Sequence, residues 1–304
     1  MKKNRLLTLL LVVFLVAGIL YLLYRVHPVS SHPTDTAEKT ELQTESMEDN
    51  VVTSGKQMEV PQNQVGNKVG SSQDRPTEDR KLSFQDLVPE SDGEIIKHTY
   101  YTLSYSEEHE QAEWVYYELN PAMVGGTATR SDKFREDPSV TTGSAALADY
   151  KSSGYDRGHL CPAASMSISQ TAMDESFYLS NMSPQVPSFN RGGWKKLEEQ
   201  VREWAKSEKQ LFVISGPVLK AGLPTIGANE VSIPEQYYKV IYAPLANRMI
   251  AFLMPNATIS RPIPSYAVPV DSIEALTGID FFSALSDSLE NRMESTSELS
   301  SWAF

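Results

Sequence analysis

The sequence predicts an α+β domain over residues 91–286, built on a central, mainly antiparallel sheet flanked by helices. Five segments have the aromatic and aliphatic character of strands: 99–105, 112–119, 211–214, 237–242 and 249–254. In the first two, apolar and polar side chains alternate at period two, as in strands with one buried face. Residues 190–206 instead space their apolar side chains by three and four, which indicates one long amphipathic helix.

The first two strands are separated by a short polar stretch, which favours a hairpin and therefore antiparallel pairing. Residues 134–150 contain Asp137-Pro138 and Thr142-Gly143-Ser144, so we expect an irregular loop that ends in a short helical turn. A further short strand starts at 154. It must end before Pro162, because proline cannot donate a hydrogen bond to a neighbouring strand.

After that strand, the pattern predicts a short apolar strand at 177–179 and a turn at 183–185. The helix that follows has four apolar side chains on one face: Trp194, Leu197, Val201 and Trp204. Two terminal helical turns are expected at 272–276 and 281–285, interrupted at Gly278.

The N-terminal segment, residues 1–26, carries Lys2, Lys3 and Arg5 and then runs without charge from 6 to 24. As a helix this run would be roughly 28 Å long, close to the thickness of a bilayer core. It therefore predicts a transmembrane helix acting as an uncleaved signal-anchor, with cleavage as the alternative. The positive charges before it would keep the N-terminus inside.

The remainder is then predicted to be exported and membrane-anchored, in a periplasm or outside the cell, or secreted if the segment is cleaved. Residues 27–90 are rich in Ser, Thr, Glu, Gln and Pro and predict a disordered polar linker. Residues 287–304 are predicted to be a flexible tail. Cys161 is the single cysteine, which excludes an intramolecular disulfide.

The formal net charge is −12 for the whole chain. Residues 91–304 hold 17 Lys and Arg against 27 Asp and Glu, a net charge of −10. Bulk charge would therefore not attract a polyanion, and any nucleic-acid binding requires a local patch. The candidate patch consists of Arg157, Arg191, Lys195, Lys196, Arg202, Lys206 and Lys209, with Arg130, Lys133 and Arg135 as possible additions. Since glutamates are interleaved with the second group, an ion-paired helix face remains the alternative.

The stretch Tyr155-Asp156-Arg157-Gly158-His159 carries the clearest chemical signal. In a strand, residues two apart point to the same face, so Arg157 and His159 would project together while Asp156 points away. Gly158 would leave room for a ligand near the backbone. A guanidinium can hold a phosphate oxygen while an imidazole moves a proton. This pair therefore predicts phosphodiester cleavage.

These residues also carry a family resemblance. The chain resembles the DNA/RNA non-specific endonucleases of the ββα-metal class, the endonuclease G-like group, over roughly residues 99–285. The resemblance rests on four motifs in the same order: 156–159 (DRGH), 180–185 (SNMSPQ), 190–194 (NRGGW) and 197–198 (LE). It implies a strand-strand-helix motif around one metal ion, DNA and RNA as substrates without sequence specificity, and products with 5′-phosphate and 3′-hydroxyl ends.

The resemblance also implies a role for each site residue. His159 would be the general base that activates water, and Arg157 would stabilise charge in the transition state. Asn190 would be the direct protein ligand of Mg²⁺, with Mn²⁺ as a substitute; the alternative is that it caps the helix. Glu198 would hydrogen-bond the waters of the metal. Asn181 would orient substrate or histidine; the alternative is a turn residue before Pro184.

Other functions are less favoured by the residues. Cys161 lies two residues after His159, over ~6 Å away on a strand, beyond contact for proton transfer. The chain has five histidines and neither an H-x-x-x-H pattern nor paired cysteines, so zinc has no support. A non-catalytic nucleic-acid-binding module on the same fold is the alternative function. Besides nucleic acid, the predicted partners are the membrane, through the N-terminal helix, and a second copy in a homodimer.

Overall fold

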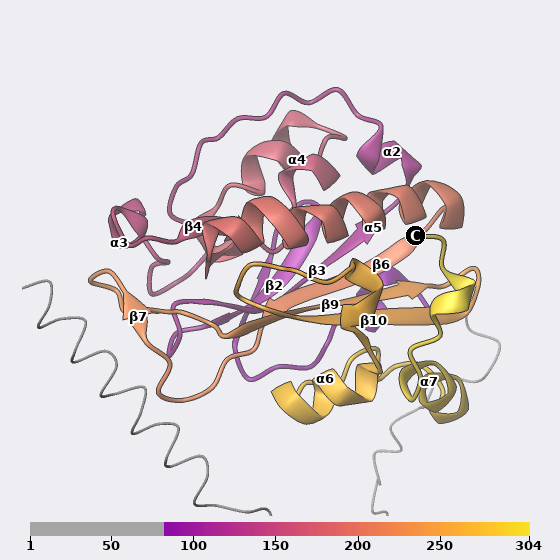
Figure 1. Cartoon of the computed structure of the whole chain (residues 1–304). Helices are drawn as coiled ribbons and strands as arrows, with labels where there is room; N and C mark the ends of the chain where they lie inside the picture. Colours follow the sequence, from indigo (N-terminus) through magenta and orange to yellow (C-terminus); the bar gives the residue numbers. More distant parts are fainter. Residues whose placement is uncertain (1–81) are drawn as a thin grey trace, which may run out of the picture. The chain divides into compact units, whose positions relative to one another are not determined.

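A seven-stranded sheet forms the centre of the fold in the computed structural model, which describes residues 82–304 (Figure 1). Every neighbouring pair is antiparallel, as the sequence predicts. In spatial order the strands are β1 (Glu94–Lys97), β2 (Tyr101–Ser106), β3 (Gln111–Leu119), β6 (Leu211–Pro217), β9 (Gln236–Ala243), β10 (Arg248–Pro255) and β11 (Ala267–Val268).

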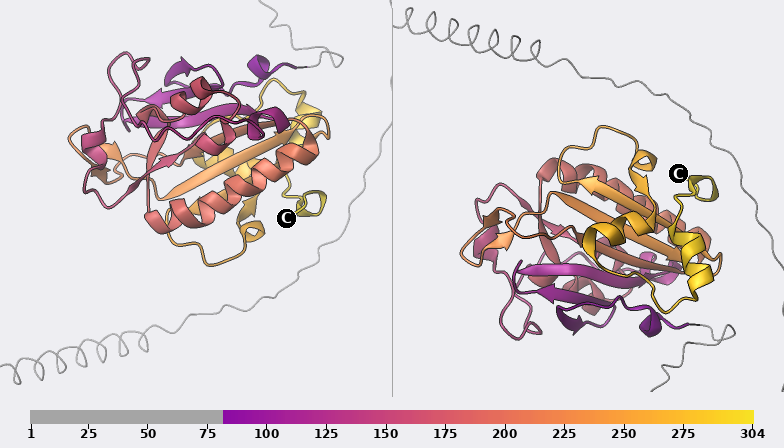
Figure 2. Two further views of the ribbon diagram at one scale, coloured as in Figure 1. Left: turned by 90° about the horizontal axis from the view of Figure 1, so that it is seen from above. Right: turned by 90° about the horizontal axis from the view of Figure 1, so that it is seen from below.

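Helices cover both faces of this sheet. The long helix α5 (Lys195–Glu208) lies on one face, and α6 (Val270–Thr277) and α7 (Asp287–Glu294) lie on the other (Figures 1 and 2). Successive residues of β3 therefore enter different cores: Val115 packs on the α5 side and Trp114 on the α6 side. This double burial explains why the central strands are apolar on both faces.

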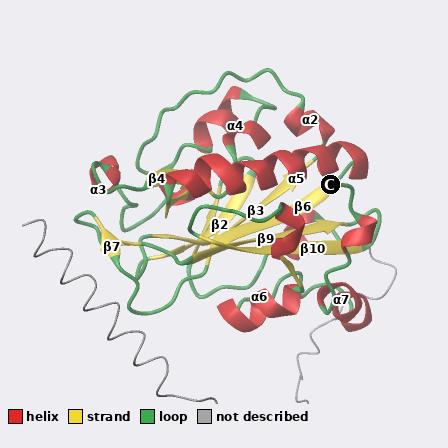
Figure 3. Cartoon of the chain, viewed as in Figure 1, coloured by secondary structure: helices red, strands yellow, loops and turns green. Residues whose placement is uncertain are grey.

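Shorter elements connect the sheet and its helices (Figure 3). The short helices are η1 (Phe84–Leu87), α2 (Pro121–Val124), α3 (Leu147–Tyr150), η2 (Ala163–Ser165), α4 (Gln170–Glu175), η3 (Leu179–Asn181), η5 (Ile263–Tyr266) and η6 (Leu299–Ser301). A small hairpin pairs β7 (Thr225–Ile226) with β8 (Val231–Ser232).

A separate two-stranded ribbon carries the signature motif. β4 (Asp156–His159) pairs antiparallel with β5 (Met182–Gln185), with Asp156 opposite Gln185 and His159 opposite Met182. A π-helical turn, η4 (Phe189–Trp194), then leads directly into α5. The chain therefore forms a strand-strand-helix unit beside the main sheet.

Two local predictions around this ribbon are wrong. Residues 183–185, predicted as a turn, belong to β5, where Pro184 lies opposite Arg157. A two-stranded ribbon has an outer edge at every strand, so the missing N–H of proline is tolerated there. Residues 177–179 do not form the predicted strand: Leu179 begins a 3₁₀ turn, and Tyr178 makes one isolated bridge with Arg135.

The ends of the described chain also differ from prediction. Within the predicted linker, Phe84 stacks on Tyr116 with ring centroids 4.3 Å apart, and Leu87 is buried. Within the predicted tail, α7 forms, and Trp302 packs on Trp204 at 4.8 Å. No helix forms at 281–285, where Phe281 and Phe282 are instead buried in the core under α6. Residues 1–81, with the predicted anchor and most of the linker, lie outside the described residues.

Replacing Trp302 by alanine tests whether the C-terminal segment belongs to the fold. Trp302 is 4% exposed and also lies under the guanidinium of Arg248, 4.7 Å from its ring centroid. The substitution should lower the free energy of unfolding by about 3–5 kcal/mol, because a large buried side chain leaves a cavity. Urea unfolding of the full chain measures this. Phe304→Ala is the matched control, and since Phe304 is half exposed it should cost less than half as much. Equal and small losses would show that the segment is a loose tail.

Candidate active site

A cavity of about 830 Å³ lies along β4 and the first turns of α5. Four of the five residues predicted for the site line it: Arg157, His159, Asn190 and Glu198. Asn181 does not. The strand-strand-helix unit thus brings together side chains that are up to 41 positions apart in the sequence.

Asp156 connects the strand to the helical turn. Its carboxylate accepts a hydrogen bond from Asn190 Nδ2 at 2.9 Å and two from Arg191, from Nε at 2.8 Å and Nη2 at 2.6 Å. Partial burial opposes ionisation, yet these donors hold the pKa of Asp156 below its ordinary value. The sequence predicts only that Asp156 points away from Arg157 and His159, and it does not predict this contact.

The contact also fixes the orientation of the Asn190 amide. A carboxylate can only accept, so the nitrogen of the amide must face Asp156. Among residues 82–304, no donor bonds the other atom, Oδ1. The side chain does not cap α5, whose N-cap position is Trp194, so the capping alternative fails. Asn190 therefore offers one oxygen to the cavity.

The π-helical turn η4 places Asn190 at the start of α5. Such turns are often found at functional sites, where one extra residue redirects a side chain. Gly193 is required by packing, because a Cβ there would lie 2.3 Å from Ile259. Gly158 in β4 is likewise required by packing. The space that a side chain at position 158 would need is occupied by the side chain of Gln185, whereas the sequence predicts a ligand there.

His159 lies between two aromatic rings. Its ring meets those of Phe134 and Phe177 edge to face, with centroids 5.8 and 5.0 Å away. Nε2 is shielded from solvent and has no hydrogen-bond partner among the described residues. Burial, followed by the charges of Arg130 and Arg157, lowers the pKa of His159 to about 3. The imidazole is therefore neutral near pH 7 and able to accept a proton.

Arg157 projects beside His159, as their spacing on a strand predicts. Its guanidinium lies 4.1 Å from the centroid of the Phe134 ring, which holds the planar group by a cation–π contact. Phe134 thus contacts both residues of the pair. No pattern in the sequence distinguishes Phe134 from the rest of the predicted irregular loop.

The carboxyl of Glu198 is close enough to a buried cation, Lys239, to be affected by its charge. Burial raises the pKa of this carboxyl, while the charges of Lys239 and Arg202 oppose the rise. Lys239 is fully buried in β9; it donates a hydrogen bond to Ser215 Oγ at 2.8 Å, and its Nζ is 4.6 Å from the Trp194 ring centroid. Its position inside an apolar strand, Tyr237–Tyr242, is the one signal that could have identified it.

Fewer basic residues line the cavity than the predicted patch and its possible additions contain. Six basic residues line the cavity: Arg130, Lys151, Arg157, Arg191, Lys195 and Arg202. The cavity is not lined by the other predicted members of the patch, which are Lys133, Arg135, Lys196, Lys206 and Lys209. Lys206 instead pairs with Glu203 at 2.6 Å, so the ion-paired alternative describes the end of α5. An acidic protein thus has a locally cationic cavity.

Asn181 has a supporting position behind the cavity. It is fully buried; its Oδ1 accepts from Cys161 N at 2.8 Å, and its Nδ2 donates to Cys161 O at 2.9 Å and Ser176 O at 2.8 Å. These bonds hold the backbone two residues after His159. The side chain has no free polar group for substrate. Cys161 itself is a buried free thiol, so a nucleophilic role has no geometric support.

The donor set fits a hard divalent cation. Mg²⁺ prefers oxygen ligands and keeps several waters, so few protein groups are needed. Asn190 Oδ1 is one free oxygen, and the Glu198 carboxylate lines the same cavity. The orientation that Asp156 imposes on the amide is the observation that supports this fit.

Comparisons with known proteins agree with this geometry. Residues 82–288 match the family model of DNA/RNA non-specific endonucleases. The chain is 38% identical over 201 residues to mitochondrial endonuclease G of Homo sapiens, covering 60% of this chain and 67% of that protein. It is 34% identical over 232 residues to nuclease C1 of Cunninghamella echinulata var. echinulata, covering 69% of this chain and 90% of that protein.

A solved structure is also similar. It is a crystal structure of the EndoG/EndoGI complex, described as showing a mechanism of EndoG inhibition. The TM-score is 0.64 at 33% sequence identity, and the match covers 70% of this chain and 93% of the other. The mixed fold around a central antiparallel sheet is therefore shared.

The predicted location is contradicted by these findings. We expected a membrane-anchored protein with its catalytic domain exported to a periplasm or the exterior. Similar proteins include nucleases that are mitochondrial. Within residues 82–304, no helix has both the length and the apolar character to cross a bilayer. The hydrophobic run on which the prediction rested, residues 6–24, lies outside the described residues.

The protonation of His159 can be followed directly. An ordinary histidine gains a proton with a midpoint near ~6.5 as the pH falls. Because burial lowers the pKa of His159 to about 3, its ring signal should not shift between pH 8 and pH 5. NMR titration of the metal-free protein, with the His159 signal assigned by its loss in His159→Gln, measures this. A midpoint near pH 6.5 would show that the ring is freely hydrated.

Proposed function

The chain belongs to the DNA/RNA non-specific endonuclease family, and we propose that it is a Mg²⁺-dependent endonuclease that cuts DNA and RNA without sequence preference. Its membership makes it a nuclease, an enzyme that hydrolyses phosphodiester bonds. The observation that carries the proposal is the shared cavity: Asn190 offers an oxygen there, and His159 offers a neutral imidazole.

In the proposed reaction, His159 accepts a proton at Nδ1, the ring nitrogen that is not shielded, from the water that attacks phosphorus. The edges of Phe134 and Phe177 keep the ring in place and exclude other water from it. Because the imidazole begins neutral, it can take up the proton at pH 7 without first losing one. The hydroxide equivalent then attacks, and the ester bond to the 3′ oxygen breaks.

The guanidinium of Arg157 binds the non-bridging oxygens of the phosphate. Its fork of donors matches two oxygens at once, and its charge balances the negative charge that grows in the transition state. The stacking on Phe134 keeps the plane of the group fixed, so little ordering is needed during reaction. Arg130 and Arg202 line the same cavity and add positive charge.

When bound, Mg²⁺, or Mn²⁺ in its place, supplies Lewis-acid stabilisation of the leaving 3′ oxygen. Asn190 would hold the ion through Oδ1, and Glu198 would accept hydrogen bonds from its waters. Asp156 acts as a positioning residue through Asn190, and Asn181 as one through the backbone after His159. The products carry 5′-phosphate and 3′-hydroxyl ends.

The lack of sequence preference follows from which groups line the cavity. Guanidinium and ammonium groups recognise phosphates, and phosphate contacts carry no base information. Six such groups line the cavity of an otherwise acidic chain. The substrate is therefore held by its backbone, and the binding should weaken as salt rises.

Plasmid nicking by the full chain tests the proposal. EDTA should abolish nicking and added Mg²⁺ should restore it. His159→Ala should lower the cleavage rate by about 10²–10⁴-fold, because the general base is lost. Its Mg²⁺ affinity and circular dichroism should stay near wild type, since His159 is not a ligand.

Lys206→Ala is the matched control, because Lys206 is ion-paired on the surface outside the cavity. It should cleave at the wild-type rate. Binding of plasmid without any metal-dependent cleavage would favour the non-catalytic binding module. Cleavage by His159→Ala at the wild-type rate would remove the imidazole from the mechanism.

A further inference from the structure

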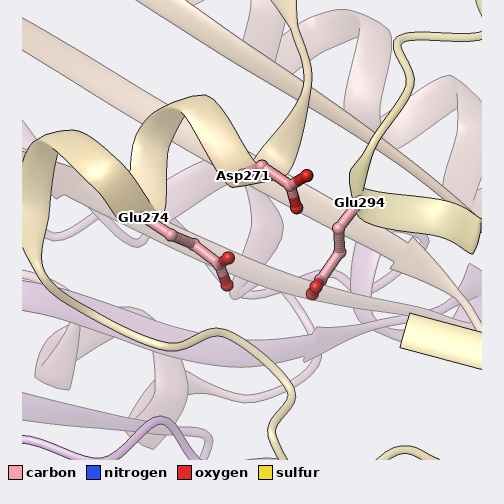
Figure 4. Close-up of side chains that lie close together, drawn as sticks. All are labelled: Asp271, Glu274 and Glu294. Atoms are coloured by element: carbon pink, nitrogen blue, oxygen red, sulfur yellow. The ribbon is translucent and has the colours of Figure 1, made fainter. Parts of the chain in front are cut away.

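Three carboxylates converge on the face of the sheet opposite α5. Asp271 and Glu274 project from α6, and Glu294 projects from the end of α7 (Figure 4). One oxygen from each lies within 4.8 Å of the other two. The two helices are only eight residues long each, and the loop between them brings these side chains to one point.

Glu294 is the buried member of the group. It is 4% exposed, and its Oε1 has no hydrogen-bond partner among the described residues although it points toward the other two carboxylates (Figure 4). Burying a carboxylate oxygen without a hydrogen-bond partner lowers the stability of the folded state. Glu274 uses Oε1 to accept from Phe281 N at 2.8 Å, which leaves its second oxygen available. Asp271 is exposed and opens the group to solvent.

The surroundings add further negative charge. Burial, followed by the charges of Glu274 and Glu290, raises the pKa of Glu294 to about 9. The pKa of Glu290 is raised to about 7, first by burial and then by the negative charges of Asp280, Glu274, Asp287 and Asp271. The charges that act on these two groups are all negative. A bound proton or a bound cation would relieve this repulsion between carboxylates.

We propose that Asp271, Glu274 and Glu294 bind a calcium ion that joins α7 to α6. The ligands are all carboxylate oxygens, which suit hard cations and disfavour zinc or copper. Two ligands of one ion can be separated by at most twice the metal–oxygen distance, which is about 4.2 Å for Mg²⁺ and about 5.2 Å for Ca²⁺. The oxygens lie within 4.8 Å of one another, which is inside the separation that two ligands of one Ca²⁺ can have. Three carboxylates also suit Ca²⁺ better than Mg²⁺, because Mg²⁺ keeps several waters and is usually held by one or two carboxylates.

This site is distinct from the cavity that holds His159. It lies on the opposite side of the sheet, in the layer formed by α6 and α7. The bound ion would connect the helix that precedes the C-terminal segment to the main core. Its expected effect is on stability and not on the chemical step.

Calcium binding to the full chain tests the inference. The parent for every arm carries Asn190→Ala, so that the proposed active-site ligand is absent. After removal of metals with a chelator, isothermal titration calorimetry should find one Ca²⁺ per chain, and added Ca²⁺ should raise Tm at pH 7.5. Mg²⁺ at the same concentration should raise Tm less.

Two substitutions locate the site. Glu294→Gln should weaken Ca²⁺ binding by about tenfold or more and abolish the rise in Tm, because a charged ligand is lost. Asp271→Asn should do the same, and since Asp271 is exposed its variant decides the question if Glu294→Gln fails to fold. Glu298→Gln removes one exposed charge nearby and is the matched control; it should bind Ca²⁺ like the parent.

The inference is overturned if the parent binds no Ca²⁺, or if Asp271→Asn binds it with the affinity of Glu298→Gln. Nicking activity, measured in the same substitutions made in the wild-type chain with Mg²⁺ present, should be unchanged. A loss of Ca²⁺ binding with normal nicking would support this site alone. A failure of Mg²⁺-dependent nicking would concern the proposed function alone.

Discussion

The geometry of the candidate active site depends on the carboxylate of Asp156. It belongs to the strand that carries Arg157 and His159, and it bonds to two consecutive residues of the π-helical turn before α5. A charge-assisted contact of this kind is stronger and more directional than a neutral hydrogen bond. It joins the two halves of the strand-strand-helix unit and selects one orientation of the Asn190 amide. The proposed metal ligand therefore depends on a neighbour that is not itself a proposed ligand.

The sheet supplies the rigid base for this unit. Because helices cover both of its faces, the residues beneath the cavity are fully buried, and among them is the ammonium group of Lys239. Lys239 is buried and Glu198 is half-buried; each stabilises the charged form of the other, whereas burial opposes the charge on both. The chain as a whole is acidic, yet charges are distributed so that cations line the cavity and carboxylates gather on the opposite face. Its net charge is thus a poor guide to where a polyanion would bind.

Features set by local periodicity were predictable, and features set by distant contacts were not. The period-two strands, the apolar face of α5 and the shared face of Arg157 and His159 all follow from neighbours in sequence. The hydrogen bond between Asn190 and Asp156 joins residues 34 positions apart, and no local sequence pattern predicts it. Pro184 suggested a turn because proline removes a donor, but only the pairing partner shows that the donor is not needed. The packing of Phe84 and Trp302, and the meeting of Glu294 with α6, likewise depend on the three-dimensional fold.

The most direct test of this account is the Mg²⁺ affinity of the Asp156→Ala chain, measured by isothermal titration calorimetry alone and combined with Asn190→Ala. If Asp156 acts through Asn190, its loss should weaken Mg²⁺ binding by about 10–100-fold although no proposed ligand is removed. In the Asn190→Ala chain the same substitution should have no further effect, because there is no amide left to orient. Unchanged affinity in Asp156→Ala, or independent losses that add in the double variant, would contradict the account.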